Sequence, residues 1–184
     1  DHGEGLGEHA EMYHGQQLYQ STLHVPLIFH WPAGFSGSQF VGPRRVPETV
    51  SLVDLSPTLL DLLRKPPLES ISGRSLLPAF QGKPLSPELH FAETFEPYFE
   101  LHSSPQRALV DDGWKYIQSR IPELYHLTED PHELKNLIGV EKEQAEKLRS
   151  LLEEKTARMK SIKAEETVVD AQMLKRLRDL GYTG

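Results

Sequence analysis

Hydrophobic residues in the first half of the chain form short, dense runs rather than a regular alternation. The run "VPLIFHWP" at residues 25–32 is almost continuously apolar, which is typical of a strand buried on both faces of a parallel sheet. A short amphipathic helix is expected just before it, over residues 15–23. A longer, mostly buried helix is expected to begin at Ser56 and Pro57, because this pair is typical of a helix cap and first turn and several leucines follow it.

From about residue 84 the pattern changes to short segments typical of antiparallel strands. The dipeptide Asp112–Gly113 between two of them predicts a tight hairpin. Over residues 140–162 apolar positions recur among charges at helical spacing, which predicts one amphipathic helix laid over one face of the sheet. The strands are expected in residues 89–95, in the two arms of 106–118 and in 123–127, and a last helix is expected over 168–180.

This change of pattern predicts an α/β chain made of three parts. Residues 1–86 are expected to belong to a larger sheet domain with a parallel, buried strand. Residues 87–165 are expected to form a small antiparallel four-stranded sheet with a helix. Residues 166–184 are expected to form a helical tail.

Composition limits the classes of function. The 184 residues are 38% hydrophobic and 26% charged, which is an ordinary globular composition able to bury a core. The formal net charge is −7 and no basic cluster stands out, so nucleic acid is not expected as a partner. No apolar run approaches the roughly 18 to 20 residues that span a bilayer. The absence of cysteine excludes disulfides and thiolate metal sites.

The opening stretch, "DHGEGLGEHAEMYHG", carries the candidate chemistry. Asp1 and His2 are adjacent, so only a loop could direct both side chains at one ion; a carboxylate with an imidazole suits a divalent metal. His9 and His14 are five residues apart and do not form the i, i+4 pair of a zinc-protease helix. Glycines at every second position would let the backbone wrap an ion closely. The alternative is a solvated acidic loop whose histidines have no function.

Several motifs in a fixed order resemble the C-terminal half of the sulfatase family, in the alkaline phosphatase superfamily. They are "DHGEGLGEH", "HGQQLYQSTLHVPLIFHWP", "VSLVDLSPTLLDLL", "GRSLLPAFQG", "HFAET", "RALVDDGWKYI", "ELYHLTEDPHELKNL" and "LRDLGYTG". The resemblance implies the C-terminal part of an alkaline-phosphatase-like sheet domain in residues 1–86. It also implies that Asp1 and His2 bind the active-site divalent cation, with Ca2+ expected and Mn2+ or Zn2+ as alternatives. His14, thirteen positions after Asp1, would bind the sulfate oxyanion as a catalytic and substrate-binding residue. His9 matches a recurrent position without an assigned role.

The chain also departs from the family pattern. It has no Cys- or Ser-x-Pro-x-Arg motif, which supplies the formylglycine nucleophile in the family, and no first pair of metal-binding aspartates. The expectation is a fragment of a sulfatase, inactive alone, whose parent hydrolyses a small-molecule or glycan sulfate ester. Two alternatives stay open: a phosphodiesterase or phosphonate monoester hydrolase of the same superfamily, and a non-catalytic sulfatase-like module. Export is common in the family, but these residues do not indicate the compartment or the oligomeric state.

Overall fold

The computed structural model describes residues 2–31, 40, 42–69, 72–159 and 171–179. It divides into two compact units, Asp1–Glu153 and Glu154–Gly184. The second unit contains the expected last helix, α6 (Ala171–Asp179); its expected glycine cap, Gly181, lies outside the described residues. The three-part organisation expected from the sequence stays a prediction. None of the described helices is both long enough and apolar enough to cross a membrane.

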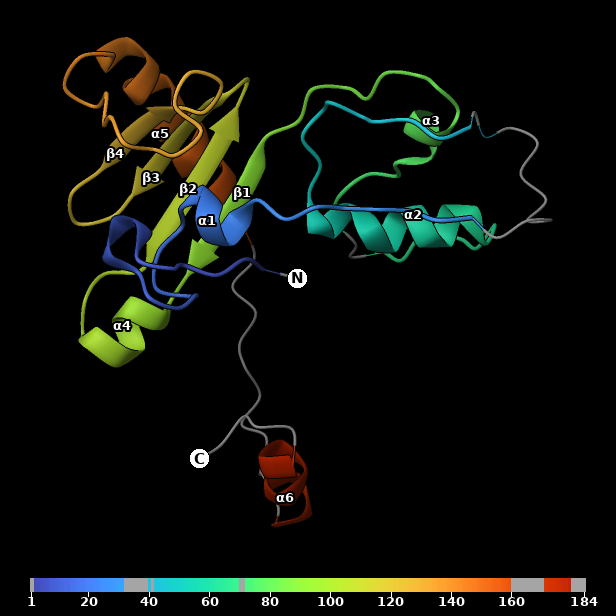
Figure 1. Cartoon of the computed structure of the whole chain (residues 1–184), viewed down its shortest axis with the longest axis horizontal. Coiled ribbons are helices and arrows are strands. Elements are labelled where there is room, and N and C mark those ends of the chain that lie inside the picture. Colours follow the sequence, from blue (N-terminus) through green and yellow to red (C-terminus); the bar gives the residue numbers. More distant parts are fainter. Residues whose placement is uncertain (1, 32–39, 41, 70–71, 160–170, 180–184) are drawn as a thin grey trace. The chain divides into compact units, whose positions relative to one another are not determined.

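The predicted antiparallel sheet is confirmed. Its four strands pair in sequence order, β1-β2-β3-β4, and every pairing is antiparallel (Figure 1). The hairpin between β2 and β3 turns at Asp112 and Gly113, whose φ angles of 47° and 78° are those that a tight two-residue turn needs. The strands are β1 (His90–Thr94), β2 (Gln106–Asp111), β3 (Trp114–Gln118) and β4 (Glu123–His126).

One face of this sheet packs against the predicted amphipathic helix, α5 (Lys142–Arg158). Because side chains alternate along a strand, every second residue faces the helix. Leu109 and Tyr116 are register partners on neighbouring strands, and both lie in one buried cluster with Leu148 and Leu152 of the helix. The helix ends at Arg158, four residues before residue 162, and residues 160–162 lie outside the described residues.

The opposite face of the sheet is covered by the N-terminal segment, which the sequence did not indicate. Leu18 joins Ala108, Ile117 and Tyr125 in a second buried cluster, and α1 (Gln20–Leu23) lies over this face (Figure 1). The helix expected over residues 15–23 is therefore wrong in its first half. Tyr19 is extended, with φ −85° and ψ 165°, and only the last four residues are helical. Packing on the sheet overrides the local helical pattern.

The buried parallel strand predicted over residues 25–32 is also wrong within its described residues, 25–31; Pro32 lies outside them. This segment is neither helix nor strand, and Ile28 is 85% exposed. Phe29 and Trp31 pack edge-on against the Phe80 ring, at centroid distances of 4.8 and 5.3 Å. A strand requires a hydrogen-bonded neighbour. The only sheet among the described residues is β1-β2-β3-β4, which does not include this segment.

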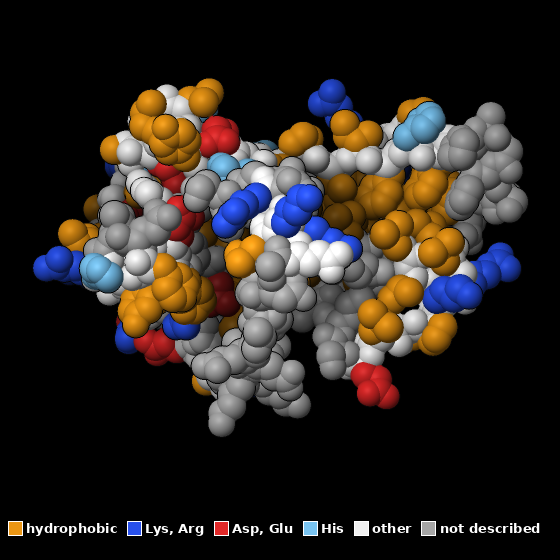
Figure 2. Space-filling view, turned by 90° about the horizontal axis from the view of Figure 1, so that it is seen from below, with side chains coloured by type: hydrophobic (Ala, Val, Ile, Leu, Met, Phe, Trp, Pro, Cys, Tyr) orange, Lys and Arg blue, Asp and Glu red, His pale blue; other side chains and the backbone are white. Residues whose placement is uncertain are grey.

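The helix expected after residue 56 begins earlier and is less buried than predicted. It is α2 (Leu55–Leu62), preceded by a 3₁₀ turn, η2 (Leu52–Asp54). The buried Asp54 carboxylate accepts the Ser51 backbone N–H at 3.0 Å, so this pair caps the 3₁₀ turn that leads into α2, and Ser56 lies within the helix. Leu59 and Leu63 are exposed, and Figure 2 shows hydrophobic side chains gathered at the surface in this region.

Three short helical elements complete the first unit. The turn α3 (Leu77–Phe80) lies within the motif "GRSLLPAFQG", and it is followed by Gly82 at φ 76°. The helix α4 (Glu96–Leu101) follows β1 directly and was not predicted. The 3₁₀ turn η1 (Glu8–Ala10) lies inside the opening loop.

Candidate functional site

Three backbone hydrogen bonds donated by glycine N–H groups hold the opening loop. One joins it to α1, and two fold it back on itself. The Gly3 N–H donates to the Thr22 carbonyl of α1 at 2.8 Å. Deeper in the loop, the Gly5 N–H donates to the Tyr13 carbonyl at 2.7 Å and the Gly7 N–H to the Glu11 carbonyl at 2.9 Å. The chain therefore folds back between residues 7 and 11. This brings residues near position 14 next to those near position 2.

His2 and His14 are brought together by this fold. Their rings stack with centroids 4.0 Å apart and planes inclined by 27°. His14 Nδ1 lies 3.2 Å from both carboxylate oxygens of Glu4, so the imidazole donates to a two-oxygen acceptor. Both side chains are about half exposed, at 46% and 47%. The candidate metal-binding residue His2 and the candidate oxyanion-binding residue His14 thus share one accessible patch. The third candidate, Asp1, lies outside the described residues.

The absence of a side chain at Gly3 is required by its packing. A Cβ at this position would collide with the backbone carbonyl oxygen of Ser21 in α1. That obstacle is backbone, so it cannot turn aside as a long side chain could. Gly3 therefore lets the segment carrying His2 lie directly on α1, where its N–H reaches Thr22.

His9 has a structural environment that differs from that of His14. Its ring stacks on the Tyr19 ring at 3.6 Å and 11°. Its Nε2 lies 3.1 Å from the His132 carbonyl, and its own carbonyl accepts from the Gln17 side chain at 3.1 Å. The residue has φ 52°, within the short turn η1. These contacts account for its place in the loop by packing alone.

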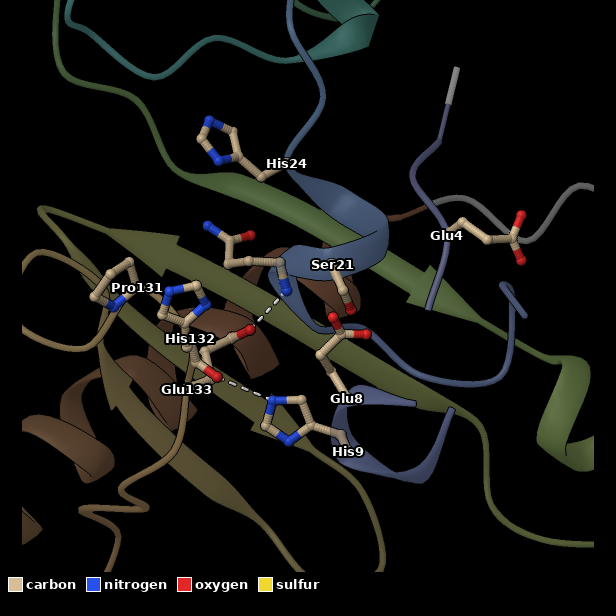
Figure 3. Close-up of a pocket in the computed structure, with 9 residues that line it drawn as sticks. Glu4, Glu8, His9, Ser21, His24, Pro131, His132 and Glu133 are labelled. Atoms are coloured by element: carbon tan, nitrogen blue, oxygen red, sulfur yellow. Dashed lines mark hydrogen bonds between the residues drawn. The ribbon is translucent and has the colours of Figure 1, made fainter. Parts of the chain in front are cut away.

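A pocket of about 390 Å³ lies between the opening loop, α1 and the loop after β4 (Figure 3). Figure 3 shows His24 at the end of α1, and His132 and Glu133 on the loop after β4. His24 also lines this space. The lining residues are Glu4, Glu8, His9, Gln20, Ser21, His24, Pro131, His132 and Glu133.

Beneath α1 lies a fully buried ion pair. Lys115 of β3 and Glu133 are both almost completely inaccessible, and Lys115 Nζ donates to Glu133 Oε1 at 2.6 Å. The second oxygen of Glu133 accepts the backbone N–H of Gln20, the first residue of α1, also at 2.6 Å. Burial lowers the pKa of Lys115, and the adjacent Glu133 carboxylate opposes that effect. One carboxylate thus joins the sheet to α1.

A second carboxylate nearby also connects the sheet to the N-terminal segment. Glu123 of β4 accepts hydrogen bonds from the hydroxyls of Tyr19 at 2.8 Å and Tyr125 at 2.5 Å. Burial, and then the contact with Glu123, raise the pKa of both phenols well above the ordinary range. Because the Tyr19 ring also stacks on the His9 ring, one group of side chains connects the loop, α1 and the sheet.

Sequence reasoning missed most of these supporting residues. Lys115, Glu123 and Glu133 are charged residues in short strands and a turn, where exposure is the ordinary expectation. Glu4, the partner of His14, was not singled out within the acidic loop. Glu11 is buried as well: its Oε1 accepts the backbone N–H groups of Gln16 and Gln17, both at 3.0 Å.

The described residues could supply only part of a metal shell. Within residues 2–31, 40, 42–69, 72–159 and 171–179, no group of three or more His, Cys, Asp or Glu side chains is arranged to hold an ion. His2 has the orientation of a ligand, since its Nδ1 lies 2.9 Å from the Gly3 carbonyl, and metal-binding histidines commonly donate their second N–H to such an acceptor. The side chain fits a divalent ion as one contributor.

Comparisons with known proteins define first the fold class. A solved structure described as a 2-O GAG sulfatase superposes with a TM-score of 0.66 at 24% identity, covering 85% of this chain and 35% of that one. A second, described as a complex with its substrate D-glucosamine-2-N,6-O-disulfate, gives 0.65 at 25% identity, covering 85% and 32%. The fold is that of the C-terminal part of an alkaline-phosphatase-like sulfatase.

The sequence comparisons then define the family. The model described as N-sulphoglucosamine sulphohydrolase, C-terminal, matches residues 7–162. Arylsulfatase K of Xenopus laevis is 34% identical over 169 residues, covering 83% of this chain and 30% of that protein. The chain therefore belongs to the sulfatase family, as its C-terminal part. It spans about 30% of the length of this relative.

Proposed function

We propose that this chain is the C-terminal part of a metal-dependent sulfatase that hydrolyses sulfate esters, and that it contributes Asp1, His2 and His14 to the active site. The observation that carries the proposal is the pairing of His2 with His14 on an accessible loop, in a chain of the sulfatase family. The solvated-loop alternative offers no reason for these two imidazoles to stack beside a carboxylate while His9 packs elsewhere.

Exposed hydrophobic residues elsewhere in the chain support the proposal that the chain is one part of a larger domain. The extended segment 25–31 has no sheet partner among the described residues, and Ile28, Leu59 and Leu63 are exposed. Relatives of about three times this length contain further chain that could cover such a surface. The nucleophile would come from that further chain, so the 184 residues alone would not turn over substrate.

In the complete site a divalent cation, expected to be Ca2+, would supply Lewis acidity and a template for the sulfate oxygens. His2 would hold the ion through Nε2, because its Nδ1 is engaged with the Gly3 carbonyl. His14 would direct its Nε2 side at the sulfate oxyanion while Glu4 holds Nδ1. A fixed donor of this kind stabilises charge that develops in the transition state.

The substrate is proposed to be a sulfated sugar or another organic sulfate ester. One structure of similar fold is described in complex with D-glucosamine-2-N,6-O-disulfate, which supports a glycan sulfate as the substrate class. The local charge is consistent with a need for metal, since the loop that carries the two histidines also carries Glu4, Glu8 and Glu11, and Glu4 contacts His14. An anionic ester would be repelled there without a cation.

Paired assays of the full-length enzyme test this function. The enzyme should be purified with its metal and assayed on an aryl sulfate and, under the same conditions, on an aryl phosphodiester and a phosphonate monoester. We expect kcat/KM on the sulfate to exceed both others by at least about 10²-fold, roughly 2.7 kcal/mol in transition-state free energy. A preference for either phosphorus ester would identify the superfamily alternative, and a metal-loaded protein inactive on all three would identify a non-catalytic module.

A further inference from the structure

We propose that Glu133 is a positioning residue of the sulfatase site, holding through α1 the segment that carries His2. This inference rests on the proposed function for its catalytic consequence, but its structural part is independent of any reaction. Glu133 lies in the loop after β4, and its carboxylate oxygens accept hydrogen bonds from Lys115 and from the backbone of Gln20. Its effect is transmitted by backbone contacts.

The first step of the path joins the sheet to α1. Glu133 is buried, and its two carboxylate oxygens have different partners: Lys115 Nζ of β3 and the backbone N–H of Gln20, each at 2.6 Å. The pair with Lys115 fixes the carboxylate on the sheet. The bond to Gln20 then fixes the first residue of α1. This helix has only four residues. So short a helix depends on such tertiary contacts for its stability.

The second step joins α1 to the candidate site. Gly3 lies against the Ser21 carbonyl so closely that no Cβ fits, and its N–H donates to the Thr22 carbonyl at 2.8 Å. His2 is the next residue, and it stacks on His14. A displacement of α1 would therefore carry Gly3 and His2 with it.

In this arrangement the buried ion pair positions α1, a role distinct from any contribution to the stability of the fold. Buried ion pairs are often replaceable by apolar residues without loss of stability, because desolvation offsets the charge attraction. A carboxylate with one oxygen on a lysine and the other on a helix N–H fixes geometry, which an apolar pair of the same volume would not. The expected consequence of its loss is misplacement of the loop rather than unfolding. An active site is sensitive to this, since a shift of about 1 Å can reduce turnover by about 10²-fold.

Two double variants of the full-length enzyme separate the positioning contact from the buried charges. Lys115→Met with Glu133→Gln removes both charges but keeps a side-chain oxygen that can accept from Gln20. Lys115→Met with Glu133→Leu removes the charges and the acceptor together. Neither leaves an unpaired buried charge. Glu129→Gln, whose side chain is 82% exposed, is the matched surface control.

The first readout is hydrogen exchange of the Gly3 amide without substrate, and the second is kcat, KM and bound metal on an aryl sulfate. The Leu double variant should exchange Gly3 at least about 10-fold faster and lose about 10- to 100-fold in kcat, with its melting temperature close to that of the Gln double variant. The Gln double variant and Glu129→Gln should stay within about 3-fold of the parent in both readouts.

A third variant covers the case in which the doubles do not fold. Gln20→Pro deletes the same N–H donor from the other side, at the first position of a helix, where proline is tolerated. It should also accelerate Gly3 exchange. Equal Gly3 exchange and equal kcat in all folded variants would overturn the positioning role. A parent enzyme without sulfatase activity would remove the proposed function, while Gly3 exchange would still decide whether Glu133 positions the loop.

Discussion

The site loop and the sheet beneath it are adjacent, but the charged side chains associated with each differ in their exposure to solvent. In the loop, His14 and Glu4 are both about half exposed and meet over a glycine-rich backbone. Beneath it, Lys115 of β3 and Glu133 of the loop after β4 form an ion pair with almost no access to water. The charged pair at the proposed site is thus accessible to solvent, whereas the pair that holds α1 is buried. On the proposed function, the loop supplies groups to the active site and the sheet determines where the loop lies.

The largest effect on this comparison should come from the contact between the loop and α1, the helix that lies between the loop and the sheet. Gly3→Ala would place a Cβ against the Ser21 carbonyl and push the His2 segment away from α1. In the full-length enzyme we expect kcat to fall by about 10²-fold, because the site groups move out of register. Steady-state kinetics and a thermal melt would measure both consequences.

Gly42→Ala is the matched control for this change, because no atom lies within 4 Å of the place a Cβ would take there. It should leave kcat within about 2-fold, as expected for a surface substitution. A Gly3→Ala enzyme as active as the Gly42→Ala enzyme would mean that the loop is not held on α1.

A change inside the sheet, away from the loop, should affect stability but not chemistry. Gly113 lies in the β2–β3 turn at φ 78°, so Gly113→Val should cost about 1 to 3 kcal/mol of unfolding free energy. Turnover per folded molecule should be unchanged. Denaturant melts together with kcat corrected for the folded fraction would show this, and a large loss of corrected kcat would place the hairpin in the active site.

The smallest effect is expected in alkaline solution, at the tyrosine pair on Glu123. Burial and the Glu123 contact raise the pKa values of Tyr19 and Tyr125 in the folded state. Their neutral form is therefore favoured by folding; this contribution is fully present below about pH 10 and is lost as the pH rises through the raised values. The melting temperature should fall above pH 10, and it should fall less in Tyr19→Phe than in the parent. Tyr13→Phe, at an exposed position, should follow the parent curve.

The sequence predicted the sheet better than the loop for a physical reason. The hairpin at Asp112–Gly113 and the stripe of α5 are local patterns, so the strands and the helix could be predicted without knowing their neighbours. The segment 25–31 has an apolar composition, but a strand depends on a partner, and none is present among the described residues. The apolar composition of the segment predicted burial, but composition does not show whether a neighbouring strand is present to pair with it.

The candidate site was predicted from resemblance rather than from pattern, and the roles of its residues stay a prediction. His14 was singled out by its spacing from Asp1, and the structure places it beside His2. The supporting carboxylate Glu133 could not be found in this way, because a charged residue in a turn is ordinarily exposed. Its importance depends on Lys115, eighteen positions away, and no local rule pairs the two.

The roles of His2 and His14 give the most direct test of the central claim that the loop carries the chemistry. His2→Ala and His14→Ala should be made in the full-length enzyme, and bound metal and kcat measured on the same preparations. His2→Ala should lose metal and activity together, as should Asp1→Ala. His14→Ala should keep near-normal metal and lose about 10² to 10³-fold in kcat, the scale for removing one fixed charge-stabilising donor. A His14→Ala enzyme that loses its metal while His2→Ala keeps it, or one that remains fully active, would contradict the account.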